Sequence, residues 1–73
     1  MSKILPKFQI SLAAARVNAG LTQEEAAKMV HVSKQSIVNW EKGKSEPDIS
    51  QFRALCDVYG IHQDYIFLPI KSN

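Results

Sequence analysis

The sequence predicts a compact all-α domain of five short helices. Residues whose side chains cap helix N-termini precede the apolar segments: Ser11, Thr22, Ser33 and Asp48. Glycines, which readily adopt the left-handed conformation at helix ends, follow two of these segments at positions 20 and 60. The chain has 73 residues, enough for one small domain. We expect residues 1–10 to form an N-terminal arm, residues 11–68 the domain and residues 69–73 a C-terminal tail.

The composition argues against several protein classes. Apolar residues make up 45% of the chain, which argues against disorder. No run of about 18 apolar residues predicts a transmembrane helix, and the N-terminus lacks the apolar segment of a signal peptide. The single cysteine cannot form an internal disulfide, and no Cys/His cluster has zinc spacing. We therefore expect a cytoplasmic protein with no metal, no cofactor and no membrane partner.

The basic residues concentrate in the first part of the chain. Residues 1–44 contain seven Lys and Arg against three Glu, whereas residues 45–73 contain two basic against four acidic residues. The net charge of +2 therefore divides into +4 and −2. This distribution favours a nucleic-acid surface in the first part, although a mixed solvated surface would give the same pattern.

In the first ten residues, apolar side chains alternate with polar ones at Phe8 and Ile10, which is typical of an extended arm. A helix over residues 12–19 is expected next, with Leu12, Ala15 and Ala19 toward the core. It ends at a glycine, where the left-handed backbone is easily adopted.

Residues 22–41 predict two helices joined by a tight turn. Thr22 and Glu25 have the spacing of a capping box, and Ser33 caps the second of the two helices. The small residues Ala26 and Ala27 allow this second helix to cross the first closely.

The helix expected over residues 34–42 has two different faces. Ile37 and Trp40 share one face at helical spacing, which predicts core packing. The polar residues of another face are Lys34, Gln35 and Asn39. Asn and Gln bind adenine bidentately in the major groove, and Lys binds guanine or phosphate. This face therefore predicts contacts with DNA bases, as in a helix-turn-helix protein.

Two further helices are expected, over residues 49–59 and 61–67. The first is capped by Asp48 with Gln51, and its apolar stripe consists of Ile49, Phe52, Leu55, Cys56 and Tyr59. Residues 65–70 are richly apolar for a chain end. We expect them to form a dimer contact or to pack against Phe8 and Ile10 of the arm.

One ordered set of residues spans most of the chain: Arg16, residues 21–27 (LTQEEAA), Val32-Ser33, Ser36-Ile37, Trp40-Glu41, Gly43-Lys44 and Pro47. This set resembles the phage Cro- and CI-type repressors of the XRE-like helix-turn-helix family, over roughly residues 11–68. The resemblance implies a lambda-repressor-like domain of five helices. Its second and third helices would form the helix-turn-helix.

The resemblance also implies roles for individual residues. An ion pair between Arg16 and Glu41 would tie the first helix to the recognition helix. Base contacts are expected from Lys34, Gln35 and Asn39, and DNA backbone contacts from Gln23, Ser33, Ser36, Lys42 and Lys44. The implied partner is double-stranded DNA with a near-palindromic operator, bound by a homodimer that forms through this domain.

Two features depart from the family pattern. His31 stands where the family usually has glycine, because the turn needs a positive φ. Glu46 and Asp48 add negative charge to a loop that commonly approaches the DNA backbone in the family.

These departures keep a second interpretation open, a modulator that has this fold but binds a partner repressor protein rather than DNA. The weak net charge, the absence of arginine from the recognition helix and the apolar Val38 favour it. A third interpretation is an antitoxin-type protein that binds both DNA and a toxin. An enzyme is not expected, because the sequence offers no nucleophile–base–acid set, no glycine-rich phosphate loop and no paired catalytic carboxylates.

Overall fold

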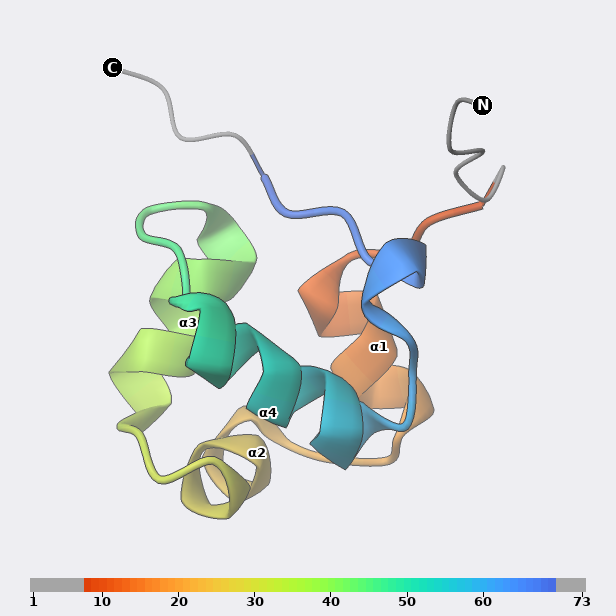
Figure 1. Ribbon diagram of the computed structural model, residues 1–73. Helices are drawn as coiled ribbons and strands as arrows, with labels where there is room; N and C mark the ends of the chain where they lie inside the picture. Colours follow the sequence, from red (N-terminus) through yellow and green to blue (C-terminus); the bar gives the residue numbers. More distant parts are fainter. Residues whose placement is uncertain (1–7, 70–73) are drawn as a thin grey trace.

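The structure, a computed structural model, describes residues 8–69 and has four α-helices in this range (Figure 1). They are α1 (Leu12–Asn18), α2 (Gln23–Met29), α3 (Lys34–Lys42) and α4 (Ile49–Tyr59). A single 3-10 turn, η1 (Gln63–Tyr65), follows. The predicted all-α class is confirmed, and α2 and α3 pack together as the expected helix-turn-helix. The described helices are all too short or too polar to span a bilayer.

The fifth α-helix, expected over residues 61–67, does not form. Only η1 is helical there, and the backbone then becomes extended because Ile66 pairs with Ile10 in a parallel bridge. The Ile10 N–H donates to the Tyr65 carbonyl at 2.8 Å, and the Phe67 N–H donates to the Ile10 carbonyl at 3.1 Å. In a helix over residues 61–67 the Phe67 N–H would donate to the Gln63 carbonyl rather than to Ile10, so the bridge and a fifth helix are mutually exclusive.

The predicted helix starts are confirmed by their side-chain hydrogen bonds. Ser11 accepts the Ala14 N–H at 3.0 Å at the start of α1. Thr22 with Glu25 forms a complete capping box at the start of α2. Ser33 caps α3, and Asp48 forms a second capping box with Gln51 at the start of α4. Local sequence rules therefore fix where each helix begins.

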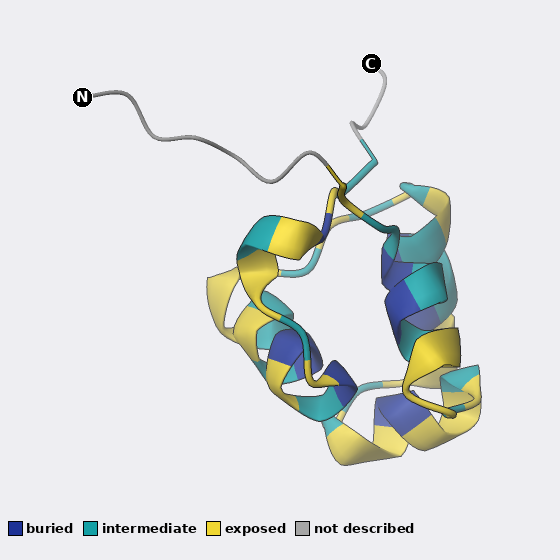
Figure 2. Cartoon of the chain, turned by 90° about the vertical axis from the view of Figure 1, so that its right-hand side faces the viewer, coloured by how far each residue is buried: buried dark blue, intermediate teal, exposed yellow. Residues whose placement is uncertain are grey.

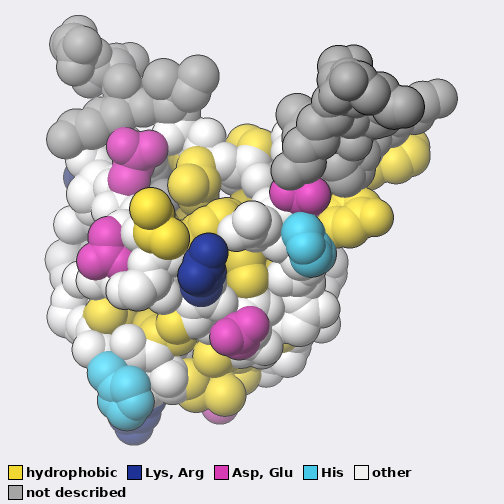
Figure 3. Space-filling model, in the orientation of Figure 1, with side chains coloured by type: hydrophobic (Ala, Val, Ile, Leu, Met, Phe, Trp, Pro, Cys, Tyr) yellow, Lys and Arg dark blue, Asp and Glu magenta, His cyan; other side chains and the backbone are white. Residues whose placement is uncertain are grey.

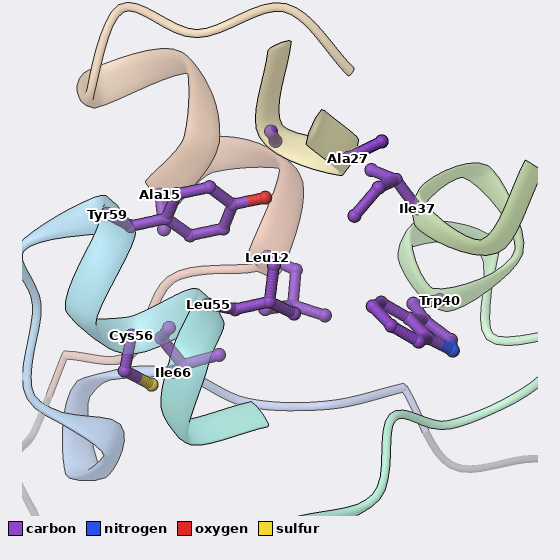
Figure 4. Close-up of a cluster of buried hydrophobic side chains, with 10 residues drawn as sticks. Leu12, Ala15, Ala27, Ile37, Trp40, Leu55, Cys56, Tyr59 and Ile66 are labelled. Carbon is purple, nitrogen blue, oxygen red and sulfur yellow. The ribbon is translucent and has the colours of Figure 1, made fainter. Parts of the chain in front are cut away.

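The core lies where all four helices meet the C-terminal segment (Figures 2 and 4). It contains the buried residues Leu12, Ala15, Ala26, Ala27, Ile37, Trp40, Leu55, Cys56, Tyr59 and Ile66. Ala26 and Ala27 are 0% and 3% exposed, and their small side chains let α3 cross α2 closely. Burial raises the pKa of the Cys56 thiol, so this cysteine is a buried apolar group as predicted.

Two predicted core positions are wrong. Ala19 is exposed because it lies past the last residue of α1, at the C-cap, where the chain turns away from the core. Ile49 is 76% exposed because it is the first residue of α4, beyond the segment that packs on the other helices. The apolar periodicity is correct within each helix but does not show where the packed part of the helix begins.

The described end of the arm meets residues 64–67 through Gln9 and Ile10. Ile10 carries the contact with Ile66, and the Gln9 side chain donates to the Asp64 carbonyl at 3.0 Å. Phe8 is 81% exposed, so the expected packing of the tail against Phe8 is wrong. The remainder of the arm, residues 1–7, and tail residues 70–73 lie outside the described residues.

We predict that the two capping boxes make stability depend on acid pH. The Thr22 backbone N–H donates to Glu25 and lowers the pKa of that carboxyl, and the Gln51 N–H does the same for Asp48. Because each pKa is lower in the folded chain, the unfolded chain binds more protons in acid. The free energy of unfolding should therefore fall as the pH drops below the ordinary values of 4.5 and 3.8.

Urea denaturation from neutral pH to about pH 3 measures this effect. The Glu25→Gln, Asp48→Asn double variant keeps side-chain acceptors at both positions and should lose part of the pH dependence. Glu24→Gln, outside the capping box, is the matched control and should change it less. An unchanged pH dependence in the double variant would contradict the assignment.

We predict that His31→Gly stabilises the fold. His31 has φ +61° in the turn between α2 and α3, and its side chain is exposed. Release of left-handed strain, about 1–2 kcal/mol, should exceed the extra unfolded-state entropy of glycine, about 0.5–1 kcal/mol. The free energy of unfolding from urea denaturation should rise by about 0.5–1 kcal/mol. His31→Asn should give a smaller rise, and a loss of stability in the glycine variant would mean that the imidazole makes a stabilising contact.

Candidate nucleic-acid interface

Helix α3 turns its apolar face inward and its polar face outward. Ile37 and Trp40 are 1% and 5% exposed, so one side of the helix is fixed against the core (Figure 4). Lys34 and Gln35 are exposed, and Asn39 is half-buried one turn along the helix. The structure therefore places the three candidate base-contacting residues on the part of α3 that the core leaves free.

Two of these residues are already ordered relative to each other. Gln35 Nε2 donates to Asn39 Oδ1 at 3.0 Å along the helix surface. This contact leaves the Gln35 side-chain carbonyl oxygen and the Asn39 amide N–H groups available to other partners. An acceptor and a donor side by side are what the edge of an adenine base requires.

Both candidate serines lie at the N-terminus of α3. Ser33 Oγ accepts the Ser36 N–H at 3.1 Å, and the two hydroxyl oxygens lie 3.0 Å apart. Ser33 thus has a structural role as the cap in addition to its candidate role at DNA. One of the two hydroxyl hydrogens lies in the hydrogen bond between them, so the other can be donated to an acceptor outside the protein.

The orientation of α3 is fixed by Glu41, which accepts hydrogen bonds from two other helices. Arg16 Nε of α1 donates to Glu41 Oε2 at 2.7 Å, and Arg16 Nη2 donates to Oε1 at 3.3 Å. Gln23 Nε2 of α2 donates to Glu41 Oε1 at 3.0 Å. The Arg16 and Glu41 side chains are only 14% and 8% exposed. We call Arg16, Gln23 and Glu41 the Glu41 network.

The charged form of Arg16 is favoured by its contacts in this network. The hydrogen bond from Arg16 to Glu41 raises the pKa of the guanidinium, which therefore stays charged. Arg16 Nη1 also donates to the Leu21 carbonyl at 2.8 Å, so the guanidinium contacts two segments at once. Burial raises the pKa of the neighbouring Tyr59 to about 12, and the negative charge of Glu41 adds to this effect. No buried side-chain nitrogen or oxygen within residues 8–69 is left without a hydrogen bond.

Gln23 has a partner that the sequence analysis did not anticipate. The sequence gave it only a DNA backbone contact, whereas the structure joins its amide to Glu41. Gln23 is the first residue of α2, and residues 23 and 41 are 18 positions apart. No local sequence pattern predicts such a pair. The only general signal is that a nearly buried carboxylate such as Glu41 needs hydrogen-bond donors around it.

The loop after α3 carries the remaining candidate residues. Lys42 and Lys44 are exposed on either side of Gly43, which ends α3 in the left-handed conformation with φ +75°. The negative charge of Asp48 is partly compensated, because its carboxylate accepts the Gln51 N–H at 2.7 Å and the Ser50 hydroxyl at 3.0 Å. These bonds lower the pKa of Asp48 and hold its charge at the positive end of α4. Of the two acids, Glu46 is therefore the one without this compensation.

Other parts of the described chain offer weaker sites. A shallow hollow of about 280 Å³ lies at the C-terminal end of α4, lined by Arg53, Cys56, Asp57, Ile61, His62 and Gln63. The face that carries α4 is chemically mixed, with acidic groups spread over it (Figure 3). No cluster of His, Cys, Asp or Glu within residues 8–69 has the arrangement of a metal site.

Comparison with known proteins gives consistent matches. A helix-turn-helix family model (HTH_3) matches residues 12–66. Similar proteins include the HTH-type transcriptional regulator ImmR of Bacillus subtilis, 33% identical over 52 residues. The HTH-type transcriptional activator BcrR of Enterococcus faecalis is 29% identical over 58 residues, and an uncharacterized HTH-type transcriptional regulator of Methanocaldococcus jannaschii is 38% identical over 48 residues.

The matches cover most of this chain but a smaller share of two of the three relatives. They cover 71%, 80% and 66% of this chain, but 41%, 28% and 73% of the respective relatives. The chain therefore spans less than half the length of the first two relatives. No solved structure is significantly similar to the chain.

The family match includes all the helices and the Glu41 network. The three relatives are named as transcriptional regulators, and none is named as an enzyme, in agreement with the sequence analysis. The chain belongs to the XRE-like helix-turn-helix family.

Proposed function

We propose that this protein is a sequence-specific regulator of transcription that inserts α3 into the major groove of double-stranded DNA. The observation that carries the proposal is the combination of a fixed inner face and a polar outer face on α3. The Glu41 network fixes the helix relative to α1 and α2. The outer face presents side chains that suit base edges.

The proposed base contacts are made by Lys34, Gln35 and Asn39. The hydrogen bond between Gln35 and Asn39 supports this assignment, because it orders both side chains before DNA is bound. Ordering a side chain in advance lowers the entropy lost on binding. Lys34, at the first position of the helix, has the length to contact guanine or a phosphate.

The proposed backbone contacts surround this surface. Ser33 and Ser36 lie at the N-terminus of α3, and Lys42 and Lys44 lie at its C-terminus. Gln23 has two N–H donors, of which Glu41 uses one, so the other is available to a phosphate oxygen. A phosphate bound there would stabilise the same amide that orients α3.

The finer proposal is a small Cro-like repressor of phage or prophage type that binds as a homodimer. Tyr65, Phe67 and Phe8 are 49%, 46% and 81% exposed at the arm–tail junction, and they provide apolar surface for a second copy. Two copies would place their α3 helices about 34 Å apart, in successive major grooves of a near-palindromic operator.

A second candidate function is that of a modulator that binds a partner repressor protein. Exposed Glu46 beside Lys44 supports it, because this acid weakens attraction to a phosphate. Val38, half-buried on α3, offers an apolar contact to a protein as well as to a thymine methyl group.

Selection from a random duplex pool at near-physiological salt separates the two candidates. The wild-type protein should enrich a two-fold-symmetric sequence, and a Lys34→Ala, Gln35→Ala double variant should not recover it. Circular dichroism must show that both proteins are folded. Absence of enrichment with folded wild-type protein would contradict DNA recognition and favour the modulator.

We predict that Gln35→Ala relaxes recognition at one base pair. The variant should lose about 1–3 kcal/mol of discrimination between bases at that position. For operator duplexes substituted at other positions, the ranking of affinities should be the same as for the wild-type protein. Fluorescence anisotropy with single-substitution operator duplexes measures this. Gln63→Ala removes an exposed glutamine from η1, on the other side of the molecule from α3 (Figure 1), and should change nothing. An equal loss on every duplex would contradict a base contact by Gln35.

A further inference from the structure

The last described residues form an extended segment that crosses the molecule from α1 to the end of α3. We call residues 66–69 the C-terminal strap. It begins at the Ile10–Ile66 bridge and continues toward the loop that follows α3 (Figure 1). Ile66 is buried and Leu68 packs against the core, whereas Phe67 between them is 46% exposed. This alternation is that of a strand with one face on the core.

The strap ends on the glycine that terminates α3. A Cβ atom placed on Gly43 would lie 2.8 Å from Pro69 Cβ and 3.4 Å from Pro69 Cγ. Gly20 and Gly60 also have positive φ, but a Cβ on either would meet nothing within 4 Å. Gly43 is therefore needed for two reasons, its left-handed backbone and the close approach of Pro69.

This contact lies at the point where α3 passes into its basic loop. The Asn39 carbonyl accepts the N–H of Gly43 and, at 2.9 Å, the N–H of Lys44. Gly43 N–H also approaches the Trp40 carbonyl at 3.3 Å. The backbone beneath Pro69 thus joins the residue proposed to contact a base, Asn39, to the residue proposed to contact a phosphate, Lys44.

We propose that the C-terminal strap holds the C-terminal end of α3 in the conformation that binds DNA, with Pro69 as a positioning residue for Lys44. The inference rests on the proposed function. Pro69 covers Gly43 and restricts the left-handed cap, and the cap sets the direction in which the chain leaves α3. Removing the ring frees the cap, so that Lys44 samples other positions and its phosphate contact is lost.

The contact itself is tested by a double-mutant cycle on stability, which needs no DNA. Gly43→Ala and Gly60→Ala introduce the same left-handed strain, but only Gly43→Ala adds a clash with Pro69. Gly43→Ala should therefore raise the unfolding equilibrium constant more than Gly60→Ala, by roughly 5-fold or more. In a Pro69→Gly background the two alanine variants should become equivalent. Equal effects in the wild-type background would overturn the contact.

The positioning role is tested by the salt dependence of operator binding. Pro69→Gly should weaken binding and lower the slope of log affinity against log salt by about one contact, as Lys44→Ala does. The two substitutions together should lower it no further than either alone. Gly60→Ala, matched for strain but remote from the strap, should keep the parent slope.

The outcomes distinguish the two levels of the proposal. The positioning role is overturned if Pro69→Gly has the wild-type salt slope, or if adding Lys44→Ala to it lowers the slope further. DNA recognition stands in either case. A folded parent protein without salt-dependent, sequence-selective binding overturns the proposed function, and the positioning role with it. The stability cycle still decides whether Pro69 and Gly43 are in contact.

Discussion

The arrangement of this domain depends on one nearly buried carboxylate. Glu41 accepts hydrogen bonds from Arg16 on α1 and Gln23 on α2, so a single side chain of α3 fixes three helices relative to one another. Such a pair adds little net stability, because desolvation of the charges offsets much of their attraction. Its value is geometric. The planar guanidinium and the two carboxylate oxygens define an angle that apolar contacts alone would leave less precise.

This constraint separates two roles within α3. The inner side, with Ile37, Trp40 and Glu41, is fixed by packing and hydrogen bonds, while Gln35 and Asn39 face away and are ordered only by each other. Changes on the outer side therefore leave the core intact. In the proposed complex, substitutions on this outer side would alter the preferred DNA sequence while α3 keeps its position.

Local features of the fold were predictable, and non-local ones were not. Each cap at Ser11, Thr22, Ser33 and Asp48 depends on atoms within three residues, so the sequence alone identified them. The 3-10 turn at η1 and the strap depend on Ile10, more than fifty residues earlier, and the apolar pattern of 61–67 suits a helix equally well. The family resemblance supplied the Arg16–Glu41 pairing, whereas Gln23 has two plausible partners and only the structure shows the one within the chain.

The negative charge in the loop after α3 changes how electrostatic attraction can act here. Asp48 is held at the N-terminus of α4, where its carboxylate is compensated by hydrogen bonds, so its effect on a nearby phosphate is reduced. Glu46 is exposed and has no such compensation. In the proposed complex, attraction to DNA would come from Lys34, Lys42 and Lys44 at defined positions rather than from a broad positive field. Precise placement of the loop would matter more under these conditions, and in our proposal the contact of Pro69 on Gly43 supplies it.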